Sequence, residues 1–319
     1  MLPLPCAPSL PSFADVPTDP RPAATRSVTA AATDLVRFGQ DVFRRRALLL
    51  RSAATGREPV FVFAHPRTGS TSVWRSLVGG RHFDSLHVHA VSRAHVRWRP
   101  EAWPVAADGV LTFGAAPAWA VRARLSLFPT RFVVTIRDPV AVNISFFLFW
   151  GRRFWVPAEW DRLESLPDAE IARLFLTRYP HRSVLRWMAR EFASATGLAA
   201  DTVPFDTARA AAVIRGDRAS ALVLRSDLDD SRKHAELAAF LGADVPPVQQ
   251  GNSIGERLGE RQPLHDRVRR VVAGIPGYVD TLVDDPFTSW FWSPAERARM
   301  RHHWAEVAQG RSSATDTHG

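Results

Sequence analysis

Four short apolar runs, each rich in β-branched and aromatic residues, alternate along the chain with segments whose apolar positions follow a helical spacing. Runs of this length and composition predict buried strands. Helices between successive strands predict a parallel, doubly wound α/β sheet, whose ligand binds at the carboxyl ends of the strands. We expect the strands at residues 59–64, 84–91, 131–137 and 220–225.

The segments around these strands predict the domain organisation. Residues 1–27 are rich in proline and predict a disordered head, and residues 309–319 are polar and predict a flexible tail. One α/β domain is expected over 28–308, beginning with an amphipathic helix at 29–51. Residues 151–199 have a helical pattern rich in tryptophan and arginine, which predicts a helical insertion or cap over the site.

The first predicted strand leads into a turn of hydroxyl-bearing residues that precedes a helical pattern. The turn contains one cation, Arg67, and the backbone N–H groups of the residues after it would converge at the positive end of the helix dipole. Such a turn can hold a phosphate or sulfate. An ordinary strand-to-helix turn is the simpler interpretation of the segment taken alone. The residues that would form the anion site are Arg67, Thr68, Gly69, Ser70, Thr71 and Ser72.

This turn differs from a nucleoside-triphosphate loop. In that loop a lysine directly follows the second glycine and reaches the terminal phosphates. Here Ser70 follows Gly69, and Lys233 is the only lysine in the chain. A kinase or ATPase is therefore disfavoured.

A second anion motif follows the third predicted strand. Asp138 suits the N-cap of the next helix and Pro139 its first position. Ser145 comes eight residues after Arg137, about two helical turns along. An arginine at a strand end and a hydroxyl on the following helix can hold one phosphate from two sides. Two such motifs at successive strand ends fit a nucleotide that is phosphorylated at both ends.

The ordered pair of motifs resembles the sulfotransferases, whose donor is 3′-phosphoadenosine-5′-phosphosulfate. Residues 65–72 resemble their 5′-phosphosulfate loop, with Arg67 where lysine is usual, and Arg137 with Ser145 resembles their 3′-phosphate site. Looser similarities extend to about residue 305 and are closest to the capsular-polysaccharide-synthesis type. The resemblance implies a P-loop-like sheet and a loop that closes over the donor, with Arg257 reaching the 3′-phosphate.

The resemblance also implies an activity. It is the transfer of a sulfuryl group from the donor to a hydroxyl of a saccharide or glycosylated metabolite, which leaves 3′,5′-adenosine bisphosphate and needs no metal. Charge that develops on the bridging oxygen must be neutralised, and Arg67 suits this role because it is always charged, although it cannot supply a proton. Replacement of the usual lysine puts the rate, or the role of this side chain, in question. At the end of the last predicted strand, Ser226 stands where relatives have a larger polar residue, so recognition of the adenine can differ.

Histidines are the first candidates for the base that accepts the proton of the acceptor. His87 and His89 alternate on the second strand and so share one face, and the pair resembles a His-x-His of glycan sulfotransferases. Glu191 is the acidic alternative. Each of these residues could instead have a purely structural role. The histidines could be core residues with their hydrogen bonds made inside the protein, and Glu191 could be one partner of an ion pair. His95 is a weaker candidate, and a metal bound by the three histidines would need a carboxylate nearby.

Composition narrows the remaining classes of function. The net charge of +9 is carried almost wholly by arginine, which suits an acidic nucleotide or acceptor and is also compatible with nucleic acid. No zinc-finger spacing, RNP motif or clustered basic helix supports nucleic-acid binding. The single cysteine, Cys6, excludes an internal disulfide. No run approaches the ~20 apolar residues of a membrane span, and the first residues lack the features of a secretory signal, so a cytoplasmic location is expected. The alternatives are a non-catalytic nucleotide-binding relative and, less favoured, a P-loop kinase.

Overall fold

A computed structural model describes residues 52, 54–55, 57–78, 83–89, 128–199, 204–242, 245–248 and 261–311. Several predictions concern segments outside these residues: the head at 1–27, the helix at 29–51, most of the tail, His95 and the loop that carries Arg257.

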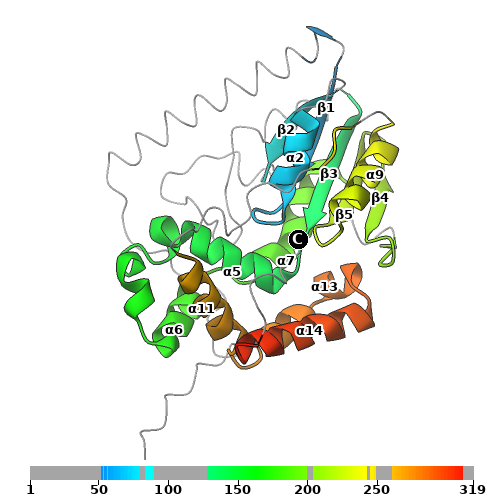
Figure 1. Cartoon of the computed structure of the whole chain (residues 1–319). Coiled ribbons are helices and arrows are strands. Elements are labelled where there is room, and N and C mark those ends of the chain that lie inside the picture. The colour runs from blue at the N-terminus through cyan, green and yellow to red at the C-terminus, as the bar shows by residue number, and fades with distance from the viewer. Residues whose placement is uncertain are drawn as a thin grey trace, which may run out of the picture.

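The centre of the fold is one five-stranded sheet with the order β2-β1-β3-β5-β4 (Figure 1). Neighbouring strands are parallel except β4, which runs antiparallel to β5. All four predicted strands are present with ends shifted by a few residues, and the second ends earlier than expected, at Val88. The strands are β1 (Glu58–Phe63), β2 (Phe83–Val88), β3 (Thr130–Ile136), β4 (Ala211–Arg215) and β5 (Ala219–Arg225).

The expectation of a wholly parallel sheet is therefore corrected by the edge strand β4. It was missed because its alanine-rich sequence has little intrinsic preference for strand. A tight turn after it, in which the Gly216 N–H donates to the Ala219 carbonyl at 2.8 Å, returns the chain along β5. The antiparallel pairing thus depends on this turn and on the neighbouring strand.

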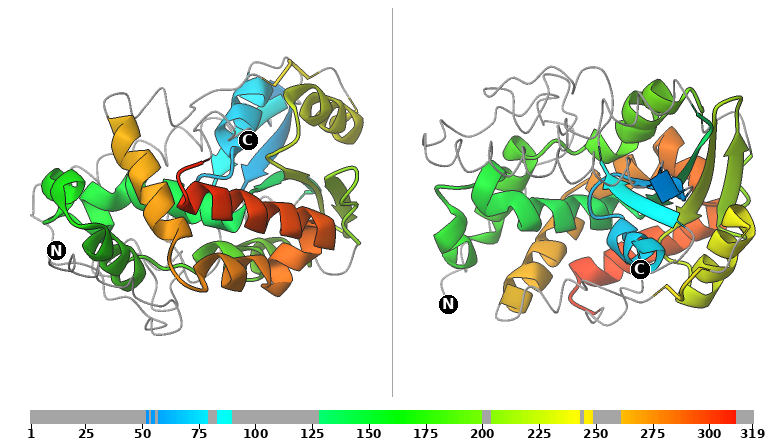
Figure 2. Two further views of the ribbon diagram at one scale, coloured as in Figure 1. Left: turned by 60° about the horizontal axis from the view of Figure 1, so that its bottom comes forward. Right: turned by 90° about the horizontal axis from the view of Figure 1, so that it is seen from above.

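Successive residues of a strand point to opposite faces of the sheet, and here they pack into different hydrophobic clusters. Both faces of the sheet are therefore buried. In β1, Val60 and Val62 contact the cluster that includes α2 (Ser70–Val78) and α9 (Asp230–Leu241). Phe61 and Phe63 contact the other cluster, which includes Trp187 and the aromatic residues of α13 (Pro286–Phe291). The two views in Figure 2 show helices on opposite sides of the strands. This two-sided burial explains why the strands read as continuous apolar runs.

A third core contains no strand residue and is built mainly from helices. It lies beyond the carboxyl end of β3, in the direction of the β3 arrowhead in Figure 1. Residues 151–199 are helical, as predicted. None of the described helices is long and apolar enough to cross a membrane. The remaining helices are α5 (Pro139–Trp150), the π-helix η3 (Gly151–Trp155), the 3-10 helix η4 (Trp160–Ser165), α6 (Asp168–Arg178), α7 (Ser183–Trp187), the π-helix η5 (Met188–Ala193), α8 (Ser194–Thr196), α11 (Gln262–Ala273), α12 (Tyr278–Val283) and α14 (Pro294–Ala308).

The strand order places a topological switch point between β1 and β3. From β1 the chain crosses through α2 to β2 on one side, and β3 lies on the other side of β1. Ligands of open α/β sheets bind outside the carboxyl ends of the strands at such a point. The two anion motifs found in the sequence follow β1 and β3, so both border this position.

Candidate anion-binding site

The turn after β1 has an unusual backbone. Arg67 and Gly69 both have left-handed conformations, with φ of 72° and 81°. Glycine adopts this conformation without cost, whereas a residue with a Cβ is disfavoured by ~1–2 kcal/mol. Backbone strain of this kind persists only where the surroundings hold it, and it clusters at ligand sites.

Thr68, between these two residues, holds the turn in place. Its hydroxyl donates to the His65 carbonyl at 2.8 Å and lies 2.8 Å from the Thr135 hydroxyl on β3. Thr68 is one of the predicted anion ligands. Its hydroxyl connects the turn to β3, so a contact with an anion would come from its backbone N–H.

The start of α5 matches the predicted cap. The Asp138 carboxylate accepts hydrogen bonds from the N–H groups of Val140 and Ala141 at 2.8 and 3.4 Å, and Pro139 is the first helical residue. Trp304 of α14 donates its indole N–H to the other carboxylate oxygen at 2.7 Å. Burial raises the pKa of Asp138, although these hydrogen bonds act in the opposite direction. The cap and the indole together fix the geometry between Arg137 and Ser145.

The two sequence motifs meet in the structure. Arg67 Nε donates to the Ser145 hydroxyl at 2.8 Å, across 78 residues of sequence. Arg137 donates from Nη1 to the Arg67 carbonyl at 3.4 Å. The Arg67 guanidinium also lies over the ring of Phe149, 4.7 Å from its centroid. Two guanidinium groups, a hydroxyl and the N-terminus of α2 therefore share one end of the sheet.

Helix α11 adds two basic residues that the sequence analysis missed. Arg269 is buried, with its guanidinium 5.6 Å from the ring centroid of Trp304. Burial lowers the pKa of Arg137, Asp138 raises it, and the charge of Arg269 lowers it again. Burial also lowers the pKa of His265 to about 4, helped by Arg269 and Arg137. Both arginines stay protonated at neutral pH, so their proximity favours an anion between them.

A sequence signal for these two residues existed. His265 and Arg269 are four residues apart and both lie on the buried side of an amphipathic helix, together with Leu264 and Val268. An arginine in the apolar phase of a helix is unusual, because burial of an unpaired charge is costly. That signal showed that Arg269 is special, but it did not show which strand end it faces.

The predicted histidine pair is also brought together, with ring centroids of His87 and His89 4.5 Å apart. His87 Nε2 lies 2.8 Å from the Ser70 hydroxyl, and its ring stacks on Trp74. His89 Nδ1 lies 2.7 Å from the Ala64 carbonyl. Because a carbonyl can only accept, Nδ1 of His89 carries the hydrogen, and in the neutral ring Nε2 carries the lone pair. This tautomer favours His89 over His87 as a base.

A third histidine next to this pair is structural. His65 Nδ1 donates to the Pro66 carbonyl at 2.8 Å, and its Nε2 lies 3.3 Å from the Ser183 hydroxyl. Burial lowers the pKa of His65 to about 3, and the charge of His89 lowers it further. His65 is therefore neutral at physiological pH and fixes the start of the turn.

Glu191 is buried in η5, a one-turn π-helix where an α-helix was expected. The residue that precedes η5, Trp187, donates its indole N–H to the His89 carbonyl at 2.7 Å. The segment that carries Glu191 is therefore attached next to the histidine pair. Single π-turns inside helices are frequent at functional sites. Glu191 stays a candidate base on these grounds.

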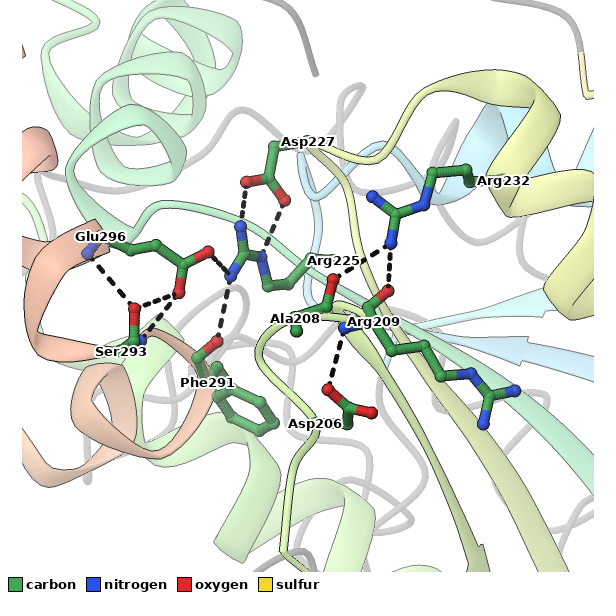
Figure 3. Close-up of polar contacts among 9 residues, drawn as sticks. All are labelled: Asp206, Ala208, Arg209, Arg225, Asp227, Arg232, Phe291, Ser293 and Glu296. Atoms are coloured by element: carbon green, nitrogen blue, oxygen red, sulfur yellow. Dashed lines mark hydrogen bonds and ion pairs between the residues drawn. The ribbon is translucent and has the colours of Figure 1, made fainter.

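Arg225, at the end of β5, is held in ion pairs and does not belong to the anion motifs (Figure 3). Its Nε and Nη2 donate to the Asp227 carboxylate at 3.0 and 2.5 Å, and its Nη1 donates to Glu296 at 2.6 Å. The other oxygen of Glu296 accepts from Ser293 at the start of α14. Arg225 is thus neutralised by two carboxylates and attaches α14 to the sheet. We do not count it as an anion ligand.

These contacts define a candidate anion-binding site with a histidine pair beside it. Thr71 and Ser72, in the first turn of α2, are half-buried, and both have a hydroxyl that could donate to an anion. The backbone N–H of Ser72 donates to the Gly69 carbonyl at 3.3 Å and so closes the turn. Among the described residues no group of three or more His, Cys, Asp or Glu side chains could hold a metal ion. No protein-family model matches this chain, and neither a curated protein nor a solved structure matches it.

Proposed function

We propose that this chain is a sulfotransferase that moves a sulfuryl group from 3′-phosphoadenosine-5′-phosphosulfate to a hydroxyl of a saccharide or glycosylated metabolite. One observation carries the proposal: the cations and hydroxyl of two separate sequence motifs, Arg67, Arg137 and Ser145, meet at the switch point of the sheet. On this proposal the sheet is P-loop-like, with a loop adapted to phosphosulfate.

The residues present suit a donor with phosphate at both ends. The N-terminus of α2 and the left-handed turn at Gly69 offer backbone donors to one group. Arg137 and Ser145, with Arg269 nearby, suit the other, because like charges held together in a buried place are stabilised by an anion between them. Arg67 lies between the two subsites and can contact both.

The reaction needs a base, an in-line arrangement and compensation of charge on the leaving oxygen. His89 Nε2 would accept the proton of the acceptor hydroxyl while its Nδ1–H stays bound to the Ala64 carbonyl. The acceptor oxygen then bonds to sulfur as the bond from sulfur to the phosphate oxygen breaks. Arg67 would donate hydrogen bonds to that phosphate oxygen without giving up a proton.

The helical segment 151–199 would cap the acceptor side. Its last part, from Trp187, packs against one face of the sheet. Its first part, up to Leu185, packs in the helical core beyond the carboxyl end of β3, where a buried network holds it to α5 and α12. In that network Asn143 donates to the His181 carbonyl at 2.9 Å and to the Tyr278 hydroxyl at 2.8 Å. A rigid attachment of this kind suits a segment that positions an acceptor.

Calorimetric titration with 3′,5′-adenosine bisphosphate, with ADP and ATP in parallel, tests the proposal. We expect micromolar affinity for the bisphosphate. Loss of a charge-assisted contact in Arg137→Ala should weaken binding by about 30–100-fold, and loss of one hydroxyl in Ser145→Ala by about fivefold. Arg173→Ala, which removes an exposed arginine of α6, is the matched control and should leave affinity unchanged. Tighter binding of ATP would favour a kinase, and absence of nucleotide binding would contradict the proposal.

A second candidate is a nucleotide-binding relative without catalysis. The contact of Arg67 with Ser145 and Phe149, in place of a lysine directed at a leaving group, favours it. Donor consumption over a panel of glycan and glycoside acceptors separates the two functions. Binding of the bisphosphate without any turnover of the donor would support the non-catalytic function.

A further inference from the structure

Ser226 lies where the two anion motifs come together. It directly follows β5, and its N–H donates at 2.8 Å to the carbonyl of Ile136, the residue before Arg137. On its side-chain side it faces the turn after β1, since a Cβ placed on Gly69 would lie 3.4 Å from Ser226 Cβ. Ser226 therefore contacts both motifs, although it belongs to neither in sequence.

The hydroxyl of Ser226 is buried and has no hydrogen-bond partner among the residues that the structure describes. The residue is 3% exposed, and no described donor or acceptor lies within bonding distance of its Oγ. By contrast, the hydroxyls of Thr68, Ser70 and Ser145 in the two motifs are all hydrogen-bonded. Nearly all buried hydroxyls in native proteins are paired, and an unpaired one is destabilising, so one kept at this position indicates a partner that arrives with a ligand.

The charges around Ser226 indicate which kind of ligand. Arg225, the residue before it, is already neutralised by Asp227 and Glu296, so β5 has no cation left to offer from that side chain. Ser226 faces Gly69, which directly precedes the N-terminus of α2 and stands two residues after Arg67. A hydroxyl beside backbone N–H groups and a guanidinium, which are all donors, can itself donate a hydrogen bond to an anionic oxygen bound there.

We infer that the Ser226 hydroxyl donates a hydrogen bond to an oxygen of the phosphate or phosphosulfate group bound at the Gly69 turn. The anion and its place follow from the contacts above, and the identity of that group as the 5′-end of an adenosine nucleotide rests on the proposed function. Ser226 is then the contribution of β5 to the site, a ligand-binding residue from a strand that neither motif includes.

Ser226→Ala tests this inference through two measurements that a structural serine would not separate. Removal of an unpaired hydroxyl should leave the melting temperature of the free protein unchanged or raised, while affinity for 3′,5′-adenosine bisphosphate falls about tenfold. Ser85→Ala is the matched control. Ser85 is also buried, and its Oγ likewise has no partner in the described part of the chain, but it lies within β2, beside Val60. It should show the same thermal behaviour and no change in affinity.

Titrations with single phosphates place the contact. We expect Ser226→Ala to weaken 5′-AMP and leave 3′-AMP unchanged, because Gly69 belongs to the turn that would hold the 5′-end. If Ser226→Ala weakened the binding of 5′-AMP and 3′-AMP equally, or weakened neither, the assignment would be overturned.

The outcomes also separate this inference from the proposed function. If the bisphosphate binds and Ser226→Ala has no effect, the inference fails while the function stands. If the wild-type chain binds only ADP, ATP or inorganic sulfate, and Ser226→Ala weakens that binding, the function fails and the inference stands. A wild-type chain that binds none of these anions would contradict both.

Discussion

The connection between the sheet and α14 gives the sharpest test of what stabilises the carboxyl end of the sheet. Arg225 is 8% exposed in its side chain and Glu296 is 16% exposed, and they are joined at 2.6 Å. Breaking a buried pair by removing one partner typically costs ~3–5 kcal/mol. Asp227, which is 44% exposed, would still pair with Arg225. We therefore expect Glu296→Gln to lower the free energy of unfolding by about 2–3 kcal/mol.

Glutamine is the informative substitution because it keeps the capping box of α14. Glu296 accepts from the Ser293 N–H, and Ser293 Oγ accepts from the Glu296 N–H. A glutamine side chain can make the same cap, so only the ion pair is lost. At ~2 °C for each kcal/mol, the melting temperature should fall by about 4–6 °C.

Glu170→Gln is the control, since it also removes an ion pair between a glutamate and an arginine, but one that is more exposed to solvent. The Glu170–Arg173 pair is bidentate, at 2.7 and 2.6 Å, whereas Glu296 accepts a single hydrogen bond from Arg225. However, the Glu170 and Arg173 side chains are 35% and 51% exposed. An exposed pair of this kind contributes ~0.5 kcal/mol, so a fall of about 1 °C is expected. Equal falls in the two variants would refute the argument that burial makes the Arg225 pair important.

The pH dependence of the Glu296 effect follows from its pKa. Burial alone would raise the pKa of Glu296, yet hydrogen bonds from Arg225 and Ser293 bring it below its ordinary value. The contribution of the pair is therefore present above the unfolded pKa and is lost as pH falls through the lower folded value. Differential scanning calorimetry should find the wild type and Glu296→Gln converging in acid. A difference that persists there would show that the charge is not its cause.

Three further predictions concern the buried polar groups and the site. Asn143→Ala removes hydrogen bonds with His181, Tyr179 and Tyr278 and should lower the unfolding free energy in urea by about 3–4 kcal/mol; a loss under 1 kcal/mol would contradict the network. Burial lowers the pKa of His181 to about 4, so between that pH and about 6.5 only the unfolded state binds the proton. The free energy of unfolding should therefore fall as pH decreases across this window, by up to ~1.4 kcal/mol per pH unit. Urea midpoints at about pH 7 and about pH 5 measure this fall, and His181→Phe should flatten the dependence. His89→Ala should reduce sulfuryl transfer by about 10²–10⁴-fold with unchanged affinity for the bisphosphate, and an unaltered rate would transfer the role to His87 or Glu191.

Much of the fold could be predicted from local pattern, because the determinants are local. The four parallel strands are apolar runs that are buried on both faces, and the cap of α5 depends on an aspartate and a proline in adjacent positions. The two anion motifs are likewise short segments in which turn and helix start are set by neighbouring residues. Edge strand β4 could not be predicted in this way, because its pairing comes from β5 and not from its alanine-rich sequence.

The composition of the site was decided by tertiary structure. The sequence pattern placed Arg67 in the turn after one strand and Ser145 on the helix after another, but their contact across 78 residues exists only because β3 lies next to β1. The same order brings Ser226 against Gly69, and packing of α11 brings Arg269 toward Arg137. Local sequence sets which residues begin a helix or end a strand, whereas strand order is selected by the burial of whole faces. For that reason the sequence predicted that the two motifs serve one nucleotide, whereas the side-chain contacts that join them, and the residues that other strands and helices add, came from the tertiary structure.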